Sequence, residues 1–279
     1  MKKKNNIKNK IFKQLEKIVK LSFPNNEIIS YTKIHCGYTN LSYLVKLNDN
    51  SKWQVRIPHE QTKKLINRKS EKNILDLLNN KDFIYFDIKT GKVIKKWLEG
   101  YNPNKSIYSK KKFLDKLFAQ IKHLHSLPIK RKYNFKKINL CAYDKQLNNL
   151  DKVYVNKFNE LINQRKNDKL VINHTDINPD NILVLIPSGQ IHIIDFEWVG
   201  LASDYWDYAN FIRETNLNYK NIKWSKYIDN FDINILGQYI YLTSVFAYLW
   251  TFNMPQTPKI IKYRILTRKQ ILIHYPNDK

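Results

Sequence analysis

The sequence is poor in cysteine, methionine and glycine, with 2, 2 and 6 of these residues among its 279. Cys36 and Cys141 lie far apart and belong to no CxxC pair, so neither a zinc ribbon nor a disulfide-stapled scaffold is predicted. We expect both thiols to be small buried side chains. A reducing compartment, the cytoplasm, is the expected location.

Long apolar runs are also missing. No stretch approaches the roughly 20 consecutive apolar residues of a membrane span, and the most apolar segment, 239–252, contains Thr243 and Ser244. The N-terminal MKKKNNIKNK leads into an amphipathic segment, so we expect no signal peptide. The length allows one large domain or two lobes that share a cleft.

Acidic residues are scarce beside basic ones: 24 Asp and Glu face 49 Lys and Arg, which gives a net charge of +25. Such a charge can indicate nucleic-acid binding. However, lysine is spread from end to end together with abundant Asn and Ile, as codon bias in an AT-rich genome would produce, whereas a nucleic-acid patch concentrates on one element. We therefore predict no specific nucleic-acid partner, although a basic surface attracts anionic nucleotides or anionic lipid.

Hydrophobic periodicity divides the chain into two unlike parts. The first part predicts helices over 11–23 and 64–79 and strands over 27–34, 41–47, 53–57, 83–87 and 92–98. The second predicts helices over 111–127, 144–165 and from 205 onward, with strands at 170–173, 182–186 and 190–195. The loop 100–105 is a plausible boundary. The prediction is an α+β fold with a small β-rich lobe, 1–97, and a larger helical lobe, 98–279.

Three polar residues follow the short strands of the second part. Asp176 and Asn181 lie in the loop HTDINPDN between two strands, and Asp195 follows the third strand in IIDFEW. Turn formation alone would explain the first two, but Asp195 in register on the next strand favours a shared site. Phosphoryl transfer needs such a set, with one carboxylate for the proton of the attacking hydroxyl and an amide and a second carboxylate for Mg²⁺.

HTDINPDNIL followed by IIDFEW resembles the paired HxDxxxxN and IDFE motifs of the choline kinase and aminoglycoside phosphotransferase group, which has a two-lobed protein-kinase-like fold. The resemblance covers roughly residues 30–255 and implies a kinase that uses ATP and Mg²⁺. It makes Asp176 the catalytic base, with His174 as a buttress of its loop. Asn181 and Asp195 become the Mg²⁺ ligands.

The first lobe carries weaker matches to the same group. CGYTNLSY resembles the segment that covers the phosphates, which implicates Gly37, Thr39 and Asn40. WQVRIP resembles the strand whose arginine, here Arg56, binds phosphate, and NRKSE resembles the helix that supplies its partner, here Glu71. Trp97 and Leu98 stand where the adenine would bind. His59 replaces the glycine expected after Pro58.

The acceptor is less well specified. The resemblance to choline kinases implies a substrate site at Glu197, Trp198, Glu214 and Trp250, because aromatic faces and a carboxylate attract a quaternary ammonium. Of the WxxW pair in that group only Trp250 is present; Ala247 holds the other position, and Phe246 or Tyr248 is a candidate replacement. Aromatic residues at helical spacing also pack in ordinary cores.

Three hypotheses remain open at this point. The first is a choline kinase that makes phosphocholine. The second is a kinase for ethanolamine, thiamine, a sugar amine or an aminoglycoside. The third is a non-catalytic basic binding module, which is disfavoured because Asp176, Asn181 and Asp195 are all present.

Overall fold

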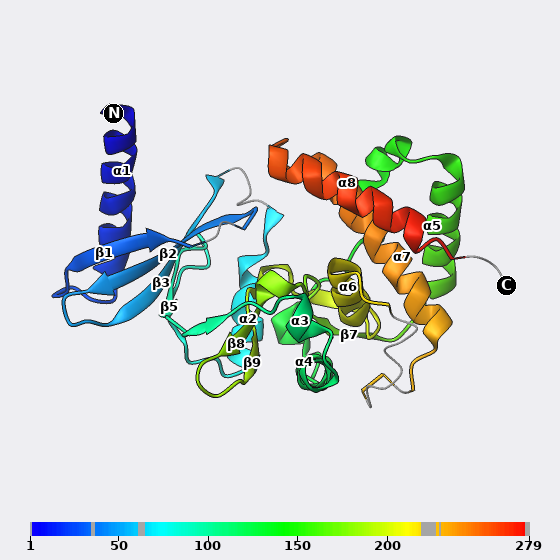
Figure 1. The fold of residues 1–279 in the computed structure, drawn as a ribbon, viewed down its shortest axis with the longest axis horizontal. Coiled ribbons are helices and arrows are strands. Elements are labelled where there is room, and N and C mark those ends of the chain that lie inside the picture. The colour runs from blue at the N-terminus through cyan, green and yellow to red at the C-terminus, as the bar shows by residue number, and fades with distance from the viewer. Residues whose placement is uncertain (1, 35–36, 61–64, 219–226, 229, 277–279) are drawn as a thin grey trace. The chain divides into compact units, whose positions relative to one another are not determined.

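A computed structural model describes residues 2–34, 37–60, 65–218, 227–228 and 230–276 (Figure 1). The chain divides into two compact units, Met1–Glu99 and Gly100–Lys279, whereas the sequence prediction places the boundary between 97 and 98. Each unit has its own hydrophobic core. Among the described residues, no helix is both long and apolar enough to cross a membrane.

The N-terminal unit is built on one antiparallel sheet with strand order β1-β2-β3-β5-β4. Its elements are α1 (Lys2–Val19), β1 (Ile28–Lys33), β2 (Asn40–Leu47), β3 (Lys52–Pro58), α2 (Arg68–Leu77), β4 (Phe83–Phe86) and β5 (Val93–Lys96). This order confirms the predicted run of three strands, a helix and two strands. The first helix begins at Lys2 rather than at the predicted residue 11.

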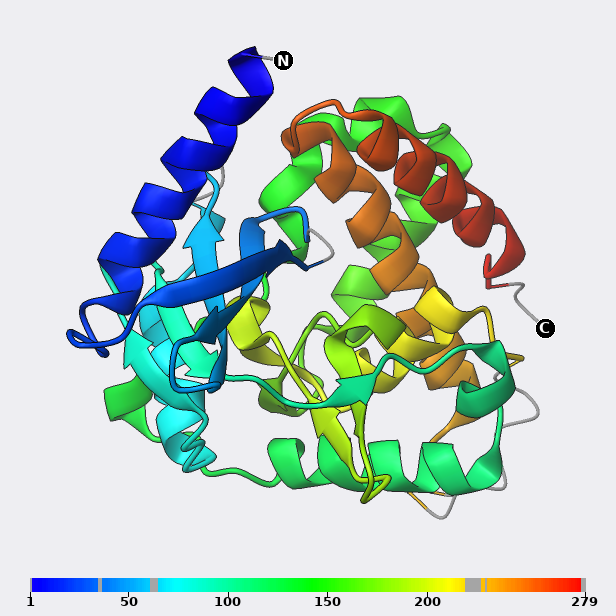
Figure 2. The same cartoon turned by 60° about the vertical axis from the view of Figure 1, so that its left-hand side comes forward.

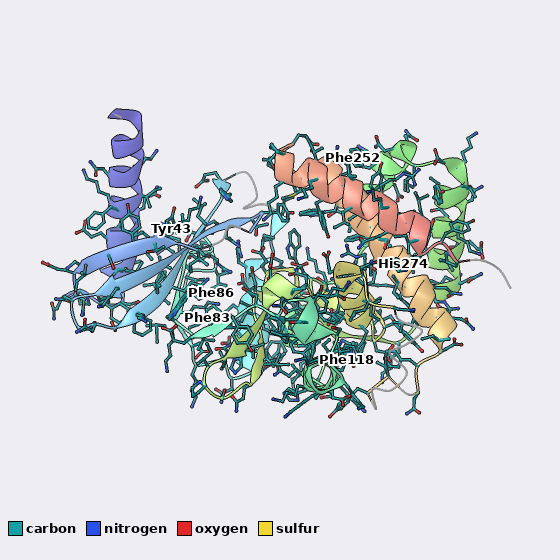
Figure 3. All side chains as sticks on the ribbon, in the orientation of Figure 1. Tyr43, Phe83, Phe86, Phe118, Phe252 and His274 are labelled. Atoms are coloured by element: carbon teal, nitrogen blue, oxygen red, sulfur yellow. The ribbon has the colours of Figure 1, made fainter. Side chains whose placement is uncertain are left out.

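The core of this unit lies between α1 and the sheet. Leu15, Ile18 and Val19 on α1 are 0–2% exposed and form one cluster with apolar residues of β2, β3 and β5. Tyr43 from β2 belongs to this cluster (Figure 3). Because side chains alternate along a strand, every second residue of β2 from Tyr43 to Leu47 is buried.

The C-terminal unit is mainly helical. Its helices are α3 (Lys105–Tyr108), α4 (Lys111–His125), α5 (Lys152–Arg165), α6 (Trp206–Thr215), α7 (Ile233–Trp250) and α8 (Pro258–Ile273). Its short strands are β6 (Gly100–Tyr101), β7 (Leu170–Asn173), β8 (Ile182–Leu185), β9 (Ile191–Ile193) and β10 (Gly200–Ser203). They form two small antiparallel sheets, β6-β8-β9 and β10-β7.

Helix α7 and its neighbours make the core of this unit. The α7 side chains are buried along most of its length, and α8 lies along its outer side in both views (Figures 1 and 2). On the α4 side, the ring of Phe118 meets Tyr208 and Phe211 of α6 edge-on, at 5.0 and 6.3 Å between centroids (Figure 3). The core therefore fixes α6, the helix that follows the predicted site loops.

Several sequence expectations fail locally. Residues 140–149, partly predicted as helix, form a 3-10 segment, and α5 begins only at Lys152. Cys141 lies in that segment and is exposed, so the expectation that it is buried is wrong. Cys36 lies outside the described residues. Strands β6 and β10 were not predicted, because each has at most four residues and pairs only with a distant strand.

Gly91 offers a test of the packing in the N-terminal unit. Its φ is +73°, and a Cβ atom there would lie 2.6 Å from Nε of Arg68 and 2.9 Å from Cγ of Pro58. Gly189 has a similar φ of +63° but nothing within 4 Å of a Cβ position. We expect Gly189→Ala to lower the free energy of unfolding by about 1 kcal/mol through backbone strain alone.

Gly91→Ala should cost roughly 1–3 kcal/mol more, because the overpacked site must also displace the buried Arg68 side chain. Urea unfolding followed by circular dichroism measures both variants. Equal losses for the two alanine variants would show that the close approach at Gly91 has no energetic consequence.

Candidate active site

The predicted site loop begins where β7 ends and finishes where β8 begins. His174 follows Asn173, the last residue of β7, and Asn181 closes a 3-10 turn, Pro179–Asn181, directly before β8. Asn178 caps that turn by accepting bonds from the backbone N–H groups of Asp180 and Asn181. The β8–β9 hairpin then returns the chain, and the backbone N–H of Ile194 donates to the carbonyl oxygen of Asn181 at 2.9 Å. Asp195, the next residue along the chain, therefore lies beside this loop.

The carboxylate of Asp176 is held on both oxygens by amides of its own loop. Asn178 Nδ2 donates to Oδ1 at 3.0 Å, and Asn181 Nδ2 donates to Oδ2 at 2.8 Å. The same Nδ2 of Asn181 donates to the carbonyl oxygen of Asp176 at 2.8 Å. Both donor contacts of Asn181 thus face Asp176, which leaves its Oδ1 as an available oxygen ligand.

His174 supports the loop through two hydrogen bonds and is fully buried. Its Nε2 donates to the carbonyl oxygen of Ile194 at 2.9 Å, and its Nδ1 accepts from the backbone N–H of Asp176 at 3.3 Å. This pattern assigns the neutral Nε2–H tautomer. Burial lowers the pKa of His174, which keeps the ring neutral in this role.

Asp207 anchors the loop backbone from α6. Its Oδ2 accepts from the backbone N–H of His174 at 2.9 Å, and its Oδ1 accepts from that of Thr175 at 2.8 Å. His125 Nε2 of α4 lies 3.1 Å from the same Oδ2. These contacts make Asp207 a positioning residue for the loop.

Thr175 stands in the left-handed region with φ of +70°, which a β-branched residue rarely adopts. Three bonds hold it there. Its N–H donates to Asp207, its Oγ1 donates to the carbonyl oxygen of Trp198 at 2.7 Å, and its carbonyl oxygen accepts from Asn210 Nδ2 at 2.8 Å. Asp195 is also left-handed, with φ of +67°. Such positions persist when the surroundings over-determine them and cluster at functional sites.

Four carboxylates converge around the loop. Burial, together with the negative charges of Glu214, Asp195 and Glu197, raises the pKa of Asp176 to about 8, and the hydrogen bond from Asn178 opposes this shift. A carboxyl with this pKa binds a proton far more strongly than an exposed aspartate. The arrangement suits a group that takes up a proton.

The residues present fit a magnesium ion that is bound mainly through nucleotide phosphates. Among the described residues, no group of three or more His, Cys, Asp or Glu side chains could hold a metal ion. Mg²⁺ keeps several waters and takes one or two protein oxygens plus substrate phosphates in kinase sites. The oxygen donors of Asn181 and Asp195 match that requirement.

In the N-terminal unit, Arg56 and Glu71 form the predicted pair. Arg56 Nη1 and Nη2 donate to the two carboxylate oxygens of Glu71 at 2.5 and 3.0 Å, and Arg56 Nε donates to the carbonyl oxygen of Gly91 at 3.2 Å. Arg68, a partner that sequence reasoning missed, donates to Glu71 at 2.8 Å. Burial alone would raise the pKa of Glu71, but the two guanidinium groups lower it. Two buried guanidinium groups thus surround one buried carboxylate.

The same cluster reaches the predicted phosphate-covering segment. Arg68 Nη2 donates to Asn40 Oδ1 at 3.0 Å, and Asn40 Nδ2 donates to Thr39 Oγ1 at 3.1 Å. Thr39 and Asn40 are buried, whereas Gly37 is exposed, with no atom within 4 Å of a Cβ position. The structure thus joins Thr39 and Asn40 to Arg56 and Glu71 through Arg68.

The predicted adenine residues follow β5. Trp97 and Leu98 are half-buried, and the backbone N–H of Trp97 donates to the carbonyl oxygen of Lys52 at 3.3 Å. Both residues therefore lie at the end of the sheet.

The predicted acceptor residues of the C-terminal unit come together from separate elements. Trp198 and Trp250 meet edge-on at 6.4 Å between ring centroids, and Trp250 meets Tyr263 of α8 in the same way at 6.3 Å. The Tyr263 hydroxyl donates to Glu214 Oε1, and Arg213 Nη1 lies 2.8 Å from that oxygen. Glu197 is buried on the 3-10 turn Phe196–Trp198, and its charge acts on Asp176.

Tyr263 was not predicted, and neither candidate replacement for the missing tryptophan lies at this group. The Phe246 ring packs on Tyr143 and Trp206, at 5.1 and 5.8 Å. Tyr248 donates its hydroxyl to the carbonyl oxygen of Asn149 at 3.0 Å. Sequence reasoning missed Tyr263 because it lies on a different helix from Trp250, and no local spacing connects the two.

A small sheet unit with a buried arginine–glutamate pair and a helical unit with an aspartate loop together define a protein-kinase-like phosphotransferase fold. Solved structures of this class are similar. Choline kinase LicA from Streptococcus pneumoniae gives a TM-score of 0.73 at 19% identity over 93% of this chain and 99% of that one. An ethanolamine kinase from Plasmodium vivax gives 0.67 at 19% over 92% and 85%. The GDP complex of an aminoglycoside 2'-phosphotransferase gives 0.72 at 16% over 94% and 98%.

The chain belongs to the choline/ethanolamine kinase family, because the sequence model of that family matches residues 31–235. An uncharacterized protein of Mycoplasma pneumoniae is 31% identical over 259 residues, which cover 90% of this chain and 88% of that protein. Family and fold together confirm the two-lobed α+β prediction and support a small-molecule kinase that acts on a hydroxyl group.

The raised pKa of Asp176 predicts a pH-dependent cost to stability. Its pKa is about 8 when folded and near 3.9 when unfolded, so between these values the folded form holds a proton that the unfolded form lacks. Stability contributed by this group therefore falls as pH rises through that window. Asp176→Asn removes this dependence, and the difference in unfolding free energy between variant and wild type should grow by up to about 1.4 kcal/mol per pH unit.

Urea unfolding at several pH values between about 5 and 8 measures this slope. The quantity to compare is the pH dependence of the unfolding free energy and not its absolute value, because the variant also loses hydrogen-bonding options in the loop at every pH. Asp180→Asn, which changes an exposed carboxylate of the same loop, is the matched control and should run parallel to wild type. A parallel curve for Asp176→Asn as well would contradict the burial of an ionisable Asp176.

Proposed function

We propose that this protein is an ATP- and Mg²⁺-dependent kinase that phosphorylates the hydroxyl of choline to give phosphocholine. One observation carries the proposal: the proton-accepting loop and the aromatic acceptor group share one hydrogen-bonded framework. Thr175 bonds to the Trp198 backbone, and Asn210 bonds to Thr175 on one side and to Arg213 on the other, at 2.8 and 2.6 Å. Arg213 in turn pairs with Glu214.

In this mechanism the acceptor oxygen attacks the γ-phosphorus of ATP while its proton passes to Asp176. The bond from the γ-phosphorus to the bridging oxygen breaks, and ADP leaves. Asn178 and Asn181 fix both oxygens of the Asp176 carboxylate, so the base needs no reorientation. Asn181 and Asp195 would hold Mg²⁺, which neutralises phosphate charge when bound.

We assign nucleotide binding to the residues of the N-terminal unit. Arg56 has its guanidinium orientation fixed by two bonds to Glu71, which suits bidentate phosphate recognition. Gly37, Thr39 and Asn40 would cover the phosphates, and Trp97 with Leu98 would bind the adenine. A solved complex of LicA with AMP, similar in fold at a TM-score of 0.72, supports a nucleotide site in this architecture. ATP use agrees with a cytoplasmic location.

Choline fits the acceptor group better than the alternatives do. A quaternary ammonium donates no hydrogen bond and is attracted by aromatic faces, which Trp198, Trp250 and Tyr263 supply. Glu214 is already paired with Arg213, whose Nη1 lies 2.8 Å from Oε1. That pairing weakens recognition of the primary ammonium of ethanolamine and, even more, of a polycationic aminoglycoside.

An acceptor screen tests the function directly. We expect ADP release with Mg²⁺ and ATP to be fastest with choline, compared with ethanolamine, thiamine, a sugar amine and aminoglycosides. Asp176→Ala should lower turnover by roughly 10²–10⁴-fold, the contribution of a positioned general base, while circular dichroism stays unchanged. Asp180→Ala, in the same loop, should retain turnover. Near-normal activity of Asp176→Ala, or no turnover of any acceptor by the wild type, would rule the mechanism out.

The aromatic group makes a separate prediction about affinity. Trp250→Ala should raise the KM for choline by roughly tenfold, because a desolvated cation–π contact contributes up to about 2 kcal/mol. The KM for ATP should change little. Tyr263→Phe is the matched variant, since it keeps the ring on Trp250 but deletes the bond to Glu214, and it should change the choline KM less. A parallel rise in both KM values for Trp250→Ala would point to a general packing defect.

A further inference from the structure

The outer face of α8 is unusually apolar for a surface helix. Its inner face is buried through Ile260, Thr267, Gln270 and Ile271. The opposite face exposes large aliphatic side chains to solvent: Ile261 (45% exposed), Ile265 (56%), Leu266 (46%), Leu272 (51%) and Ile273 (64%). Three of them, at positions 261, 265 and 272, follow one stripe of the helix at spacings of four and seven.

This pattern differs from the ordinary one for a helix at the edge of a domain. Such a helix carries one apolar stripe toward the core and polar residues outside, whereas a helix that is apolar all round is normally buried. Single exposed aliphatic residues need no explanation, but several on one face mark an interaction surface. The outer face of α8, defined by these five residues, therefore lacks a cover in the described chain.

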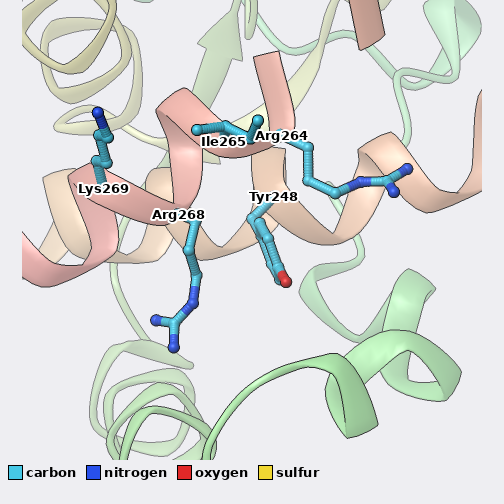
Figure 4. A pocket seen from close by; sticks show the side chains of 5 residues that line it. All are labelled: Tyr248, Arg264, Ile265, Arg268 and Lys269. Atoms are coloured by element: carbon cyan, nitrogen blue, oxygen red, sulfur yellow. The ribbon is translucent and has the colours of Figure 1, made fainter. Parts of the chain in front are cut away.

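The charge of the helix indicates what covers this face. Between Pro258 and Ile273 there are five cationic residues and no acidic one: Lys259, Lys262, Arg264, Arg268 and Lys269. The last turn of α7 and the cationic residues of α8 also form a shallow pocket of about 260 Å³, lined by Tyr248, Arg264, Ile265, Arg268 and Lys269 (Figure 4). Ile265 and Lys269 belong to both the pocket and the exposed side of the helix.

The guanidinium of Arg268, which lines this pocket, is held at the start of α5. Its Nη2 donates to Asp151 Oδ2 at 2.6 Å, and its guanidinium lies 4.8 Å from the ring centroid of Tyr154. Its Nη1 is buried and has no hydrogen-bond partner among the described residues. A buried cationic N–H without a partner is costly and is usually met by a water or an anion.

We propose that the outer face of α8 docks on the surface of an anionic phospholipid bilayer. The exposed aliphatic residues enter the boundary between head groups and acyl chains, while the exposed Lys262 and Lys269 extend to the lipid phosphates around them. A fluid lipid surface suits this face, because it needs no matching shape.

A second copy of the chain is a poorer occupant. In a two-fold interface the same patch meets itself, so the five cations of one α8 would face the five of the other. The whole chain has a net charge of +25, which adds to the repulsion. An anionic partner satisfies both the apolar and the cationic part of the face.

Vesicle co-sedimentation of the full chain tests the proposal, with phosphatidylglycerol-containing vesicles compared with pure phosphatidylcholine vesicles. We expect binding to the anionic vesicles that weakens with added salt. Ile265→Glu/Leu272→Glu removes the apolar contact, and Lys262→Glu/Lys269→Glu reverses two charges; each should weaken partitioning by roughly tenfold or more. ADP release should stay at the wild-type level, since none of these side chains belongs to the proposed site.

Ile129→Glu is the matched control, because Ile129 is 49% exposed in the same unit but lies on the loop after α4; it should bind vesicles as the wild type does. Three outcomes would overturn the proposal. They are equal binding to neutral and anionic vesicles, unchanged binding by both double variants, and absence of vesicle binding together with a wild-type dimer that Ile265→Glu/Leu272→Glu dissociates. One further result would reduce the site to a simple anion pocket. In that result, millimolar inorganic phosphate at constant ionic strength abolishes vesicle binding, and both double variants bind vesicles as the wild type does.

Discussion

The carboxylate of Asp207 holds the backbone of the loop on which the proposed chemistry depends. Its two oxygens accept from the consecutive N–H groups of His174 and Thr175, and His125 reaches it from α4. Because Asp207 is fully buried, these bonds form away from competing water, where they are strong and where losing one is costly. They keep Thr175 in a left-handed conformation that a threonine would otherwise leave.

Two sets of contacts extend from the loop that Asp207 anchors. Toward Asp176, the loop presents a carboxylate whose two oxygens are both occupied by side-chain amides and whose pKa is raised by burial and by neighbouring carboxylates. Toward the aromatic group, Thr175 bonds to the Trp198 backbone and to Asn210. The proposed base and the proposed acceptor residues are therefore parts of one rigid framework, as precise positioning for phosphoryl transfer requires.

Carboxylates are paired with arginines in both units. The buried Glu71 is paired with Arg56 and Arg68, and the partly exposed Glu214 is paired with Arg213. The two clusters differ in balance. In the first, two guanidinium groups surround one carboxylate, whereas in the second the Arg213–Glu214 pair lies beside the aromatic rings of Tyr263 and Trp250. On α8 the cationic residues lie beside exposed aliphatic ones instead, and we infer a lipid surface from that combination.

The sequence by itself determined the order of elements in the N-terminal unit, the two-lobed α+β plan and the family, because alternating strand patterns and the HTDINPDN and IIDFE segments are local signals. It also predicted the Arg56–Glu71 pair, through a resemblance to a family in which these positions match. The roles assigned to Asp176, Asn181 and Asp195 remain predictions.

Only the tertiary structure decided which side chains complete each cluster. Tyr263, Asn210 and Arg68 contact their partners across helices, strands or loops that the sequence does not bring together, and the short strands β6 and β10 exist only because distant strands pair with them. The same is true of α8: its composition is readable in the sequence, but which of its apolar residues are buried and which are exposed depends on how α7 packs against it. Packing between distant segments leaves no periodic trace in the chain, and for that reason sequence reasoning could not find these contacts.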